Sequence, residues 1–309
     1  MARSAPWAGG GCAPVVRSGR LVAALVFCSL VGGVGATSAQ PAQPAAPAAR
    51  QPRRQFNLPG MPDPPAPAAP EVITRGENGR VVVRATRLDH PLVIDGTLDE
   101  PFYKDVKSMS DFIQTVPNEG QPASERTEAW IAFDSDYLYL SGRCWDSAPP
   151  EEWTANEYRR DTNQLRQNDM FGAMIDTFHD RRNGFNFYTN PIGARADQVV
   201  TNEGNPNADW NPVWFVRTGR FDGGWTVEMA IPFRSIRYLS GPGHEWGIQI
   251  RRAIRRKNEW THLTFVPAAT GGVTSIFRAS VAATLVGMDP PAAAKNIELK
   301  PYGISKLAS

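Results

Sequence analysis

Cysteine is scarce in this chain, and its scarcity excludes two kinds of chemistry. Two of the three cysteines, Cys12 and Cys28, lie within the first 39 residues, so Cys144 is the only one in the remainder. A single cysteine cannot form an internal disulfide. Cys144 also lies in an alternating apolar segment, a pattern that favours a small buried side chain over a catalytic thiol.

An excess of charge of one sign is also missing once the N-terminal region is set apart. The first 70 residues hold six of the 33 lysines and arginines but only one of the 31 acidic residues. The remainder therefore has 27 basic and 30 acidic residues, a formal charge of −3. This balance excludes a strongly basic body and predicts no nucleic-acid partner.

Short motifs of hydrolytic and phosphate chemistry are absent as well. The chain has no Gly-x-Ser-x-Gly, no phosphate-binding loop and no His-Glu-x-x-His, and its four histidines lack the spacing of a zinc site. Several aspartates could supply oxygen ligands to calcium, but they form no contiguous calcium loop, so the sequence assigns no metal ligand. These aspartates are Asp134, Asp136, Asp146, Asp169, Asp176 and Asp209.

Residues 1–39 have the order of a secretory signal peptide. Arg3, Arg17 and Arg20 precede the apolar run LVAALVFCSLVGGVG, and small residues follow at 36–39. The run is shorter than the roughly 20 apolar residues of a comfortable transmembrane helix. We therefore predict cleavage after Ala39 and export to the periplasm, the outer membrane or the cell exterior.

Residues 40–70 are nearly all Pro, Ala, Gln and Arg. A segment of this composition cannot bury a core. It is predicted to be an extended, disordered linker between the signal peptide and a folded domain.

From Val81 onward, short alternating apolar segments are separated by Asp, Asn, Gly and Pro, which is typical of an all-β protein. The alternation predicts three β-hairpins, over residues 127–146, 213–233 and 246–267. Their turns are expected at 134–136, at 222–224 and near 257–258, and the glycines of the second turn allow the positive φ of a tight hairpin.

An isolated hairpin cannot bury its apolar face, so these strands are expected to stack as two antiparallel sheets. The result is an all-β fold, a two-sheet β-sandwich that forms one domain over residues 81–286. Only the segments after Pro101 and around 233–238 are expected to make a helical turn or two.

The stretch DTFHDRRNGFNFYTNP, residues 176–191, allows two interpretations. Asp176 and Asp180 could form the carboxylate pair of a glycosidase. The apolar residues before Asp176 and the alternation that restarts at Phe185 instead indicate a strand, a charged loop and a second strand. Turn preferences favour the second interpretation.

Several phrases together resemble the family 9 carbohydrate-binding module. They are IDGTLDEPFY, DSDYLYLSGRCWD, NDMFGAMIDTFHDRRNGFNFYTNPIGARAD, DWNPVWFVRTGRFDGGWTVEMAIPFRSIRY and WGIQIRRAIRRKNEW, and they cover roughly residues 81–286 in order. The resemblance is closest to the version at the N-terminus of bacterial proteins that continue into an outer-membrane β-barrel. It implies a jelly-roll β-sandwich, sugar binding between two tryptophans, and structural calcium that steadies loops. Residues 290–309 resemble the first strand of such a barrel, which would tether the domain at the outer membrane.

Two loops contain the side chains that a sugar binder needs, namely aromatic planes beside polar groups. One loop carries Trp153, Glu157 and Arg159, and the other carries Asn207 and Trp210. Both tryptophans lie outside the alternating strands, a position that allows their rings to be exposed. The alternative is that each ring folds back onto the core.

The densest basic cluster is Arg251, Arg252, Arg255, Arg256 and Lys257. Such a hairpin could meet phosphate groups near a membrane. The expectation is instead that its arginines face solvent or pair with acids such as Glu228 and Glu245 across the sheet.

The sequence thus predicts non-catalytic binding of a polysaccharide or oligosaccharide. One alternative is a periplasmic accessory domain of an outer-membrane β-barrel protein without sugar binding. The other is an O-glycosyl hydrolase of carbohydrate catabolism.

Overall fold

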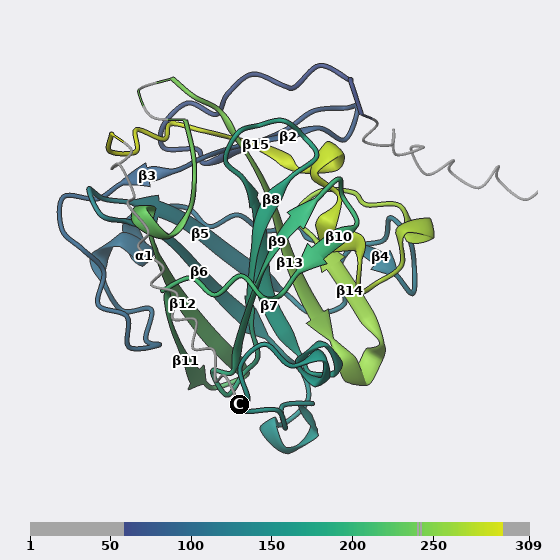
Figure 1. The fold of residues 1–309 in the computed structure, drawn as a ribbon. Helices are drawn as coiled ribbons and strands as arrows, with labels where there is room; N and C mark the ends of the chain where they lie inside the picture. Colours follow the sequence, from purple (N-terminus) through teal and green to yellow (C-terminus); the bar gives the residue numbers. More distant parts are fainter. Residues whose placement is uncertain (1–58, 240, 242, 293–309) are drawn as a thin grey trace, which may run out of the picture. The chain divides into compact units, whose positions relative to one another are not determined.

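A computed structural model describes residues 59–292 with the exception of 240 and 242 (Figure 1). The predicted signal peptide, most of the predicted linker and residues 293–309 of the predicted barrel strand lie outside the described residues. None of the helices in the described part is long and apolar enough to cross a membrane.

The described chain folds into two sheets. The larger has ten strands, eight of them in one path and two attached through β13. Its path is β1 (Ile73–Arg75), β2 (Val81–Arg84), β15 (Ala283–Val286), β13 (Trp246–Ile254), β7 (Met170–Asp176), β8 (Gly184–Thr189), β9 (Arg195–Thr201) and β10 (Asn205–Asn207), and the attached strands are β14 (Glu259–His262) and β4 (Ile113–Val116). The smaller sheet has the order β11 (Phe215–Phe221), β12 (Gly224–Pro232), β6 (Tyr137–Trp145), β5 (Thr127–Phe133) and β3 (Thr86–Arg87).

The core lies between these sheets, because alternate side chains of each strand face inward. Leu138, Leu140 and Cys144 of β6 and Phe171 and Ile175 of β7 are buried in one hydrophobic cluster. Burial raises the pKa of the Cys144 thiol to about 12, so the predicted inert role of this cysteine agrees with its surroundings. The predicted β-sandwich is confirmed.

The three predicted hairpins are confirmed as β5–β6, β11–β12 and β13–β14. Two strand pairs depart from the predicted antiparallel pattern. β2 and β15 run parallel, as do β3 and β5. Alternation reveals which face of a strand is buried but not the direction of its neighbour, so sequence alone could not identify these pairs.

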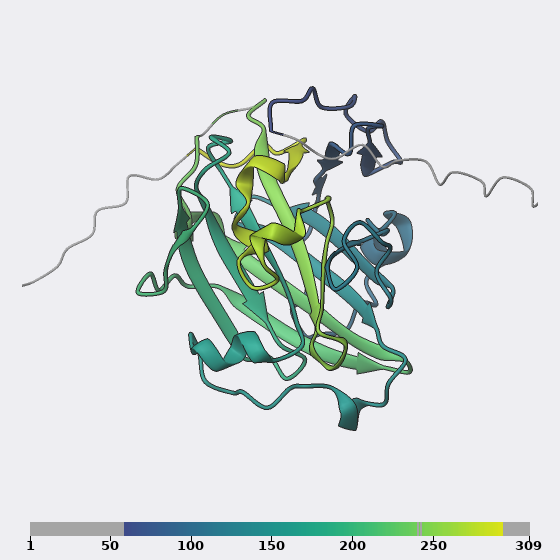
Figure 2. The ribbon, with the colours of Figure 1, turned by 90° about the vertical axis from the view of Figure 1, so that its right-hand side faces the viewer.

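Helical segments are short and lie outside the sandwich (Figure 2). The predicted turn after Pro101 is α1 (Pro101–Asp105), which packs on the outer face of the smaller sheet. The others are 3₁₀ turns: η1 (Pro150–Glu152), η2 (Asn163–Gln167), η3 (Phe233–Ser235), η4 (Arg255–Lys257), η5 (Ala268–Thr270), η6 (Ser275–Phe277) and η7 (Ala279–Val281). Of these, η6 and η7 cover the outer face of the larger sheet beside β7 and β13.

The described end of the predicted linker contacts the domain. Asp63 accepts hydrogen bonds from Arg80 at 2.7 Å and Arg181 at 3.2 Å, and it also accepts one from Thr284. Together these partners lower the pKa of Asp63 despite its partial burial. The folded unit therefore begins before Val81, the boundary that the alternating pattern predicted.

Candidate functional site

Trp153 is buried, which does not fit the sugar-contact role predicted for it. The side chain belongs to the core cluster and is only 8% exposed. Its indole nitrogen donates a hydrogen bond of 3.0 Å to the Ala148 carbonyl, and the Arg220 guanidinium lies 5.7 Å from the ring centroid. The Trp153 ring therefore folds back onto the core, which is the second of the two alternatives for this residue.

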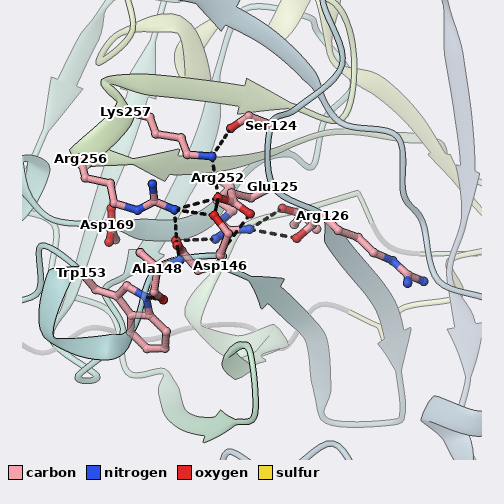
Figure 3. A network of polar contacts seen from close by, with 12 residues as sticks. Ser124, Glu125, Arg126, Asp146, Ala148, Trp153, Asp169, Arg252, Arg256 and Lys257 are labelled. Carbon is pink, nitrogen blue, oxygen red and sulfur yellow. Dashed lines mark hydrogen bonds and ion pairs between the residues drawn. The ribbon is translucent and has the colours of Figure 1, made fainter.

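A network of charged residues fixes the chain around Trp153 (Figure 3). Asp146, directly after β6, receives hydrogen bonds from Arg252 at 3.4 Å and from Arg256. Glu125 is contacted by Arg256 at 2.7 Å and by Lys257 at 2.5 Å. These hydrogen bonds and ion pairs hold the pKa of Glu125 at about 2, although burial acts in the opposite direction.

The same network corrects the expectation for the basic cluster. Arg252, Arg256 and Lys257 do pair with acids, but their partners are Asp146 and Glu125. The acids named from the sequence contact other residues, since Glu228 bonds to Tyr103 and Glu245 lies 3.5 Å from His179. Alternation identifies neighbours within a sheet, whereas these partners lie in loops that adjoin the hairpin.

Glu157 is also buried, in contrast to the expected role as a sugar contact. One carboxylate oxygen accepts the backbone N–H groups of Tyr158 and Arg159, and the Arg159 side chain donates to both oxygens at 3.1 and 3.0 Å. Hydrogen bonds from Arg159 lower the pKa of Glu157 to about 2, and those from its side chain have a larger effect than the one from its backbone N–H. The carboxylate thus stabilises its own loop, while the Arg159 side chain stays 73% exposed.

The second predicted loop is more open. Asn207 is exposed at the end of β10 and accepts a hydrogen bond of 2.9 Å from the backbone of Asp209. Trp210 is half-buried, and its ring lies 4.9 Å from Phe185 and 5.7 Å from Phe187.

The two predicted loops adjoin through Arg160. Its guanidinium donates to Asp197 at 2.6 Å and to the Pro212 carbonyl at 3.1 Å. In the described part of the chain, however, Trp153 and Trp210 make no ring contact with each other. The predicted residues therefore share one region without forming a pair of facing tryptophans.

A groove that sequence reasoning missed lies on the outer face of the smaller sheet. It has a volume of about 440 Å³ and is bounded by β6, β11, β12 and the turn at Gly96. Its lining includes Arg143, Trp145, Arg220, Phe221, Asp222 and Thr226. We call it the Trp145 groove.

Aromatic and charged side chains meet in the Trp145 groove. The rings of Trp145 and Phe221 pack edge to face at 5.5 Å. The Arg126 guanidinium lies 4.5 Å from the Trp145 ring centroid and pairs with Glu128 at 2.5 Å. The Arg143 guanidinium lies 5.8 Å from the same centroid and 3.6 Å from Glu128. The alternation of β6 contained the signal, because Cys144 faces the core and its neighbour Trp145 must face outward.

The stretch at 176–191 forms the predicted strand, loop and strand, as β7 and β8. Asp176 is 1% exposed and accepts the backbone N–H groups of Asp180 at 3.2 Å and Arg181 at 2.7 Å. Burial is the largest influence on Asp176 and raises its pKa, whereas Asp180 has a lowered pKa because Asn183 and loop N–H groups bond to it. Both carboxylates thus organise the loop, which fits the turn interpretation rather than a glycosidase pair.

Within the described residues, no group of three or more His, Cys, Asp or Glu side chains is arranged to hold a metal ion. The calcium implied by the family resemblance stays a prediction.

Comparison with known proteins gives similarity at the level of structure. No family model matches the sequence, and no curated protein matches it. A family 9 carbohydrate-binding module from Caldicellulosiruptor kristjanssonii, solved with cellotriose, is similar at a TM-score of 0.47 and 13% identity over 71% of this chain and all of that one. A family 9 module from the same organism, solved with glucose, is similar at a TM-score of 0.47 and 14% identity, over 70% of this chain and 99% of that one.

A third similar structure is a proposed carbohydrate-binding protein from Bacteroides uniformis. The TM-score is 0.52 at 10% identity, over 66% of this chain and 97% of that one. At such identities the likeness concerns the fold. The described domain is therefore a β-sandwich similar in fold to a solved, proposed carbohydrate-binding protein, in agreement with the resemblance drawn from its sequence.

Proposed function

We propose that this domain binds carbohydrate without catalysis and that the Trp145 groove is the binding site. The observation that carries the proposal is the combination, in one groove, of an accessible tryptophan, a second aromatic ring and flanking arginines. Sugar rings have one apolar C–H face and a rim of hydroxyl groups, so a binder needs this pairing of aromatic and polar side chains. The volume lies within the usual range of small-molecule sites, about 300–1,000 Å³.

In the proposed complex, a sugar ring lies against Trp145 and contacts Phe221 at its edge. Arg126 covers one face of Trp145, but its side chain is 65% exposed. An exposed cation–π contact contributes only about 0.5–1 kcal/mol, so a sugar can displace Arg126 at small cost. Arg143 and Asp222 are then available to bond the hydroxyl groups.

Binding of the full chain to a broad glycan panel, followed by calorimetry on any hit, tests the proposal. Trp145→Ala should abolish retention. Phe215→Ala is the matched control, because Phe215, on β11 of the same sheet, is an exposed aromatic residue that lines a different groove. Retention that survives in the Trp145 variant would place the sugar elsewhere, and absence of any binding would exclude the function.

The loops chosen from the sequence form a second arm of the same experiment. Asn207→Ala and Arg159→Ala change exposed side chains, and because Arg159 pairs with the buried Glu157, the circular dichroism of each variant should first match that of the parent. If these variants lose binding while Trp145→Ala retains it, the sugar lies on the loops that carry Trp210.

One observation favours the alternative of an accessory domain without sugar binding. Trp153 and Glu157, two of the residues chosen for sugar contact, are buried in structural roles. This alternative predicts that the domain binds no glycan of the panel and that the protein recovered from its native compartment is found with the membranes.

We further propose export through the signal peptide of residues 1–39. Mass spectrometry of the protein recovered from its native compartment should give Gln40 as the first residue. A product that retains the leader would contradict export by cleavage at this site.

A further inference from the structure

We propose that Thr226 and Glu228 are positioning residues of the Trp145 groove, and that sugar binding there depends on whether Glu228 carries a proton. The two side chains hold residues 95–98, which we call the Gly96 turn and which form one wall of the groove. This inference rests on the proposed function and adds regulation by pH to it.

The Gly96 turn is not part of either sheet, so its place at the groove depends on side-chain contacts. It lies between β3 and α1 in the chain, whereas the rest of the groove is formed by β6, β11, β12 and the turn that joins the last two. Paired strands are held by a ladder of backbone hydrogen bonds, which a turn on the face of a sheet does not have. A few contacts with β12 must therefore hold this wall in place.

Two residues of β12 bind the backbone of the Gly96 turn. Thr226 Oγ1 donates a hydrogen bond of 2.5 Å to the Gly96 carbonyl. Glu228 accepts the backbone N–H groups of Gly96 at 2.8 Å and Asp95 at 3.1 Å. Thr226 and Glu228 are two residues apart on one strand, so both side chains face the turn. Glu228 is fully buried and cannot touch a sugar, so its role is to position the wall.

The Gly96 turn also lies directly on the backbone of β11. A Cβ atom at Gly219 would be 2.2 Å from the Gly96 carbonyl oxygen, and one at Gly96 would be 2.7 Å from the Thr218 carbonyl carbon. The turn therefore cannot move closer to the sheet. Any loosening of its contacts with β12 moves it away from β11 and changes the width of the groove.

The charged and titratable groups around Glu228 come from four parts of the structure. They are Tyr103 of α1 and Glu100 at its N-cap, Asp95 of the turn, Arg217 of β11 and Arg143 of β6. Arg217 lies opposite Glu228 in the strand register, but its guanidinium donates to the Val216 carbonyl at 2.9 Å. Burial is the largest influence and raises the pKa of Glu228 to about 7, against the hydrogen bonds from Tyr103 and Gly96. The carboxyl group therefore changes its charge near neutral pH.

A bound sugar should favour the protonated form of Glu228. A sugar ring against the Gly96 turn replaces water above it and gives Glu228 no new hydrogen bond. It thus adds to the burial that already outweighs the hydrogen bonds, and the pKa of Glu228 becomes higher in the complex than in the free domain. The affinity is therefore complete below the pKa of the free domain and falls as the pH rises through about 7.

Calorimetry on the full chain with a neutral oligosaccharide from the glycan panel, at about pH 5.5 and about pH 8.5, tests this linkage. If binding raises the pKa by about 0.5, the affinity should be about threefold lower at the higher pH. Glu228→Gln should bind with an affinity that does not change between the two pH values. Equal affinities in the unmodified protein, or a pH dependence that persists in the variant, would overturn the inference and leave the proposed function intact.

Thr226→Val and Thr226→Ser test the second positioning residue. Valine keeps the volume of the side chain but cannot donate to Gly96, so it should weaken binding about two- to tenfold, as expected for one lost hydrogen bond. Serine keeps the donor and should restore the affinity of the unmodified protein. Equal affinity in the two variants would overturn the role assigned to Thr226.

Nuclear magnetic resonance gives a readout that needs no sugar. The amide protons of Asp95 and Gly96 are donated to Glu228, so their chemical shifts should titrate together with a midpoint near pH 7. In Glu228→Gln this titration should be absent. Constant shifts in the unmodified protein would overturn the inference alone, whereas an empty glycan panel would overturn the proposed function and the inference with it.

Discussion

Tyr103 donates a hydrogen bond of 2.7 Å to Glu228 and so joins α1 to the second strand of the smaller sheet. Glu228 is fully buried, and its other oxygen accepts the backbone N–H groups of Gly96 at 2.8 Å and Asp95 at 3.1 Å. The Tyr103 hydroxyl also lies 2.8 Å from Ser141 Oγ. One carboxylate thus positions both the helix and the turn that bounds the Trp145 groove.

Stability should fall as the pH rises through the range in which Glu228 ionises. Burial, the largest influence, raises the pKa of Glu228 to about 7 from 4.5, so the folded state binds this proton more tightly than the unfolded chain does. The favourable contribution is complete below pH 4.5 and is lost between there and pH 7, a loss of about 3 kcal/mol. Denaturant unfolding across this range measures the change.

Glu228→Gln is the control for this titration. The amide can accept from Gly96 and donate to Tyr103, whose hydroxyl can donate to Ser141 instead, so the contacts survive without a titrating group. The variant should be at least as stable as the parent at neutral pH and should lack this part of the pH slope. An unchanged slope would show that Glu228 is not its source.

Asp146→Ala should destabilise the domain by about 3–5 kcal/mol, since it removes the carboxylate that faces Arg252. The Arg252 side chain is 1% exposed, so its charge would be buried without an acidic partner. Lys257→Ala removes a partly exposed partner of Glu125 and should cost less than about 1 kcal/mol. Equal losses in chemical denaturation would contradict this assignment.

Gly142→Ala should lower stability by about 1–3 kcal/mol, because a methyl group there overpacks the core. A Cβ at this position would lie 2.7 Å from the Phe171 ring of the opposite sheet and 3.0 Å from Val227. Gly204→Ala is the comparison, since the nearest atom to its added Cβ is 3.9 Å away. Thermal unfolding should give a clearly lower Tm for the Gly142→Ala variant than for the Gly204→Ala variant.

Trp153→Ala should cost about 3–5 kcal/mol, as expected for removal of a buried tryptophan. Trp145 is only half-buried on the sheet surface, so Trp145→Ala should cost less. Loss of sugar binding in the Trp153 variant would therefore reflect unfolding unless far-UV and near-UV circular dichroism match the parent. A Trp153 variant of parental stability would contradict the burial described for this ring.

Much of this fold could be predicted from local patterns, and the candidate site could not. The hairpin of β5 and β6 follows from the alternation of Ile131 and Phe133 and from the turn at 134–136. Whether a loop tryptophan such as Trp153 is exposed depends on partners distant in sequence, here Arg220 and the network around Asp146. Trp145 became a candidate only when β11 and β12 were placed beside β6.

The parallel pair of β2 and β15 has a mechanical consequence. Val82 lies opposite Thr284 and Arg84 lies opposite Val286. The chain segment that leads into β2 and the segment that follows β15 are therefore at opposite ends of this strand pair. Tension between these two ends would load the hydrogen bonds of the pair together, in shear, instead of opening them one after another. Forced unfolding is governed by the unfolding rate. The domain should therefore resist stretching along its chain ends better than peeling at the hairpin β11–β12.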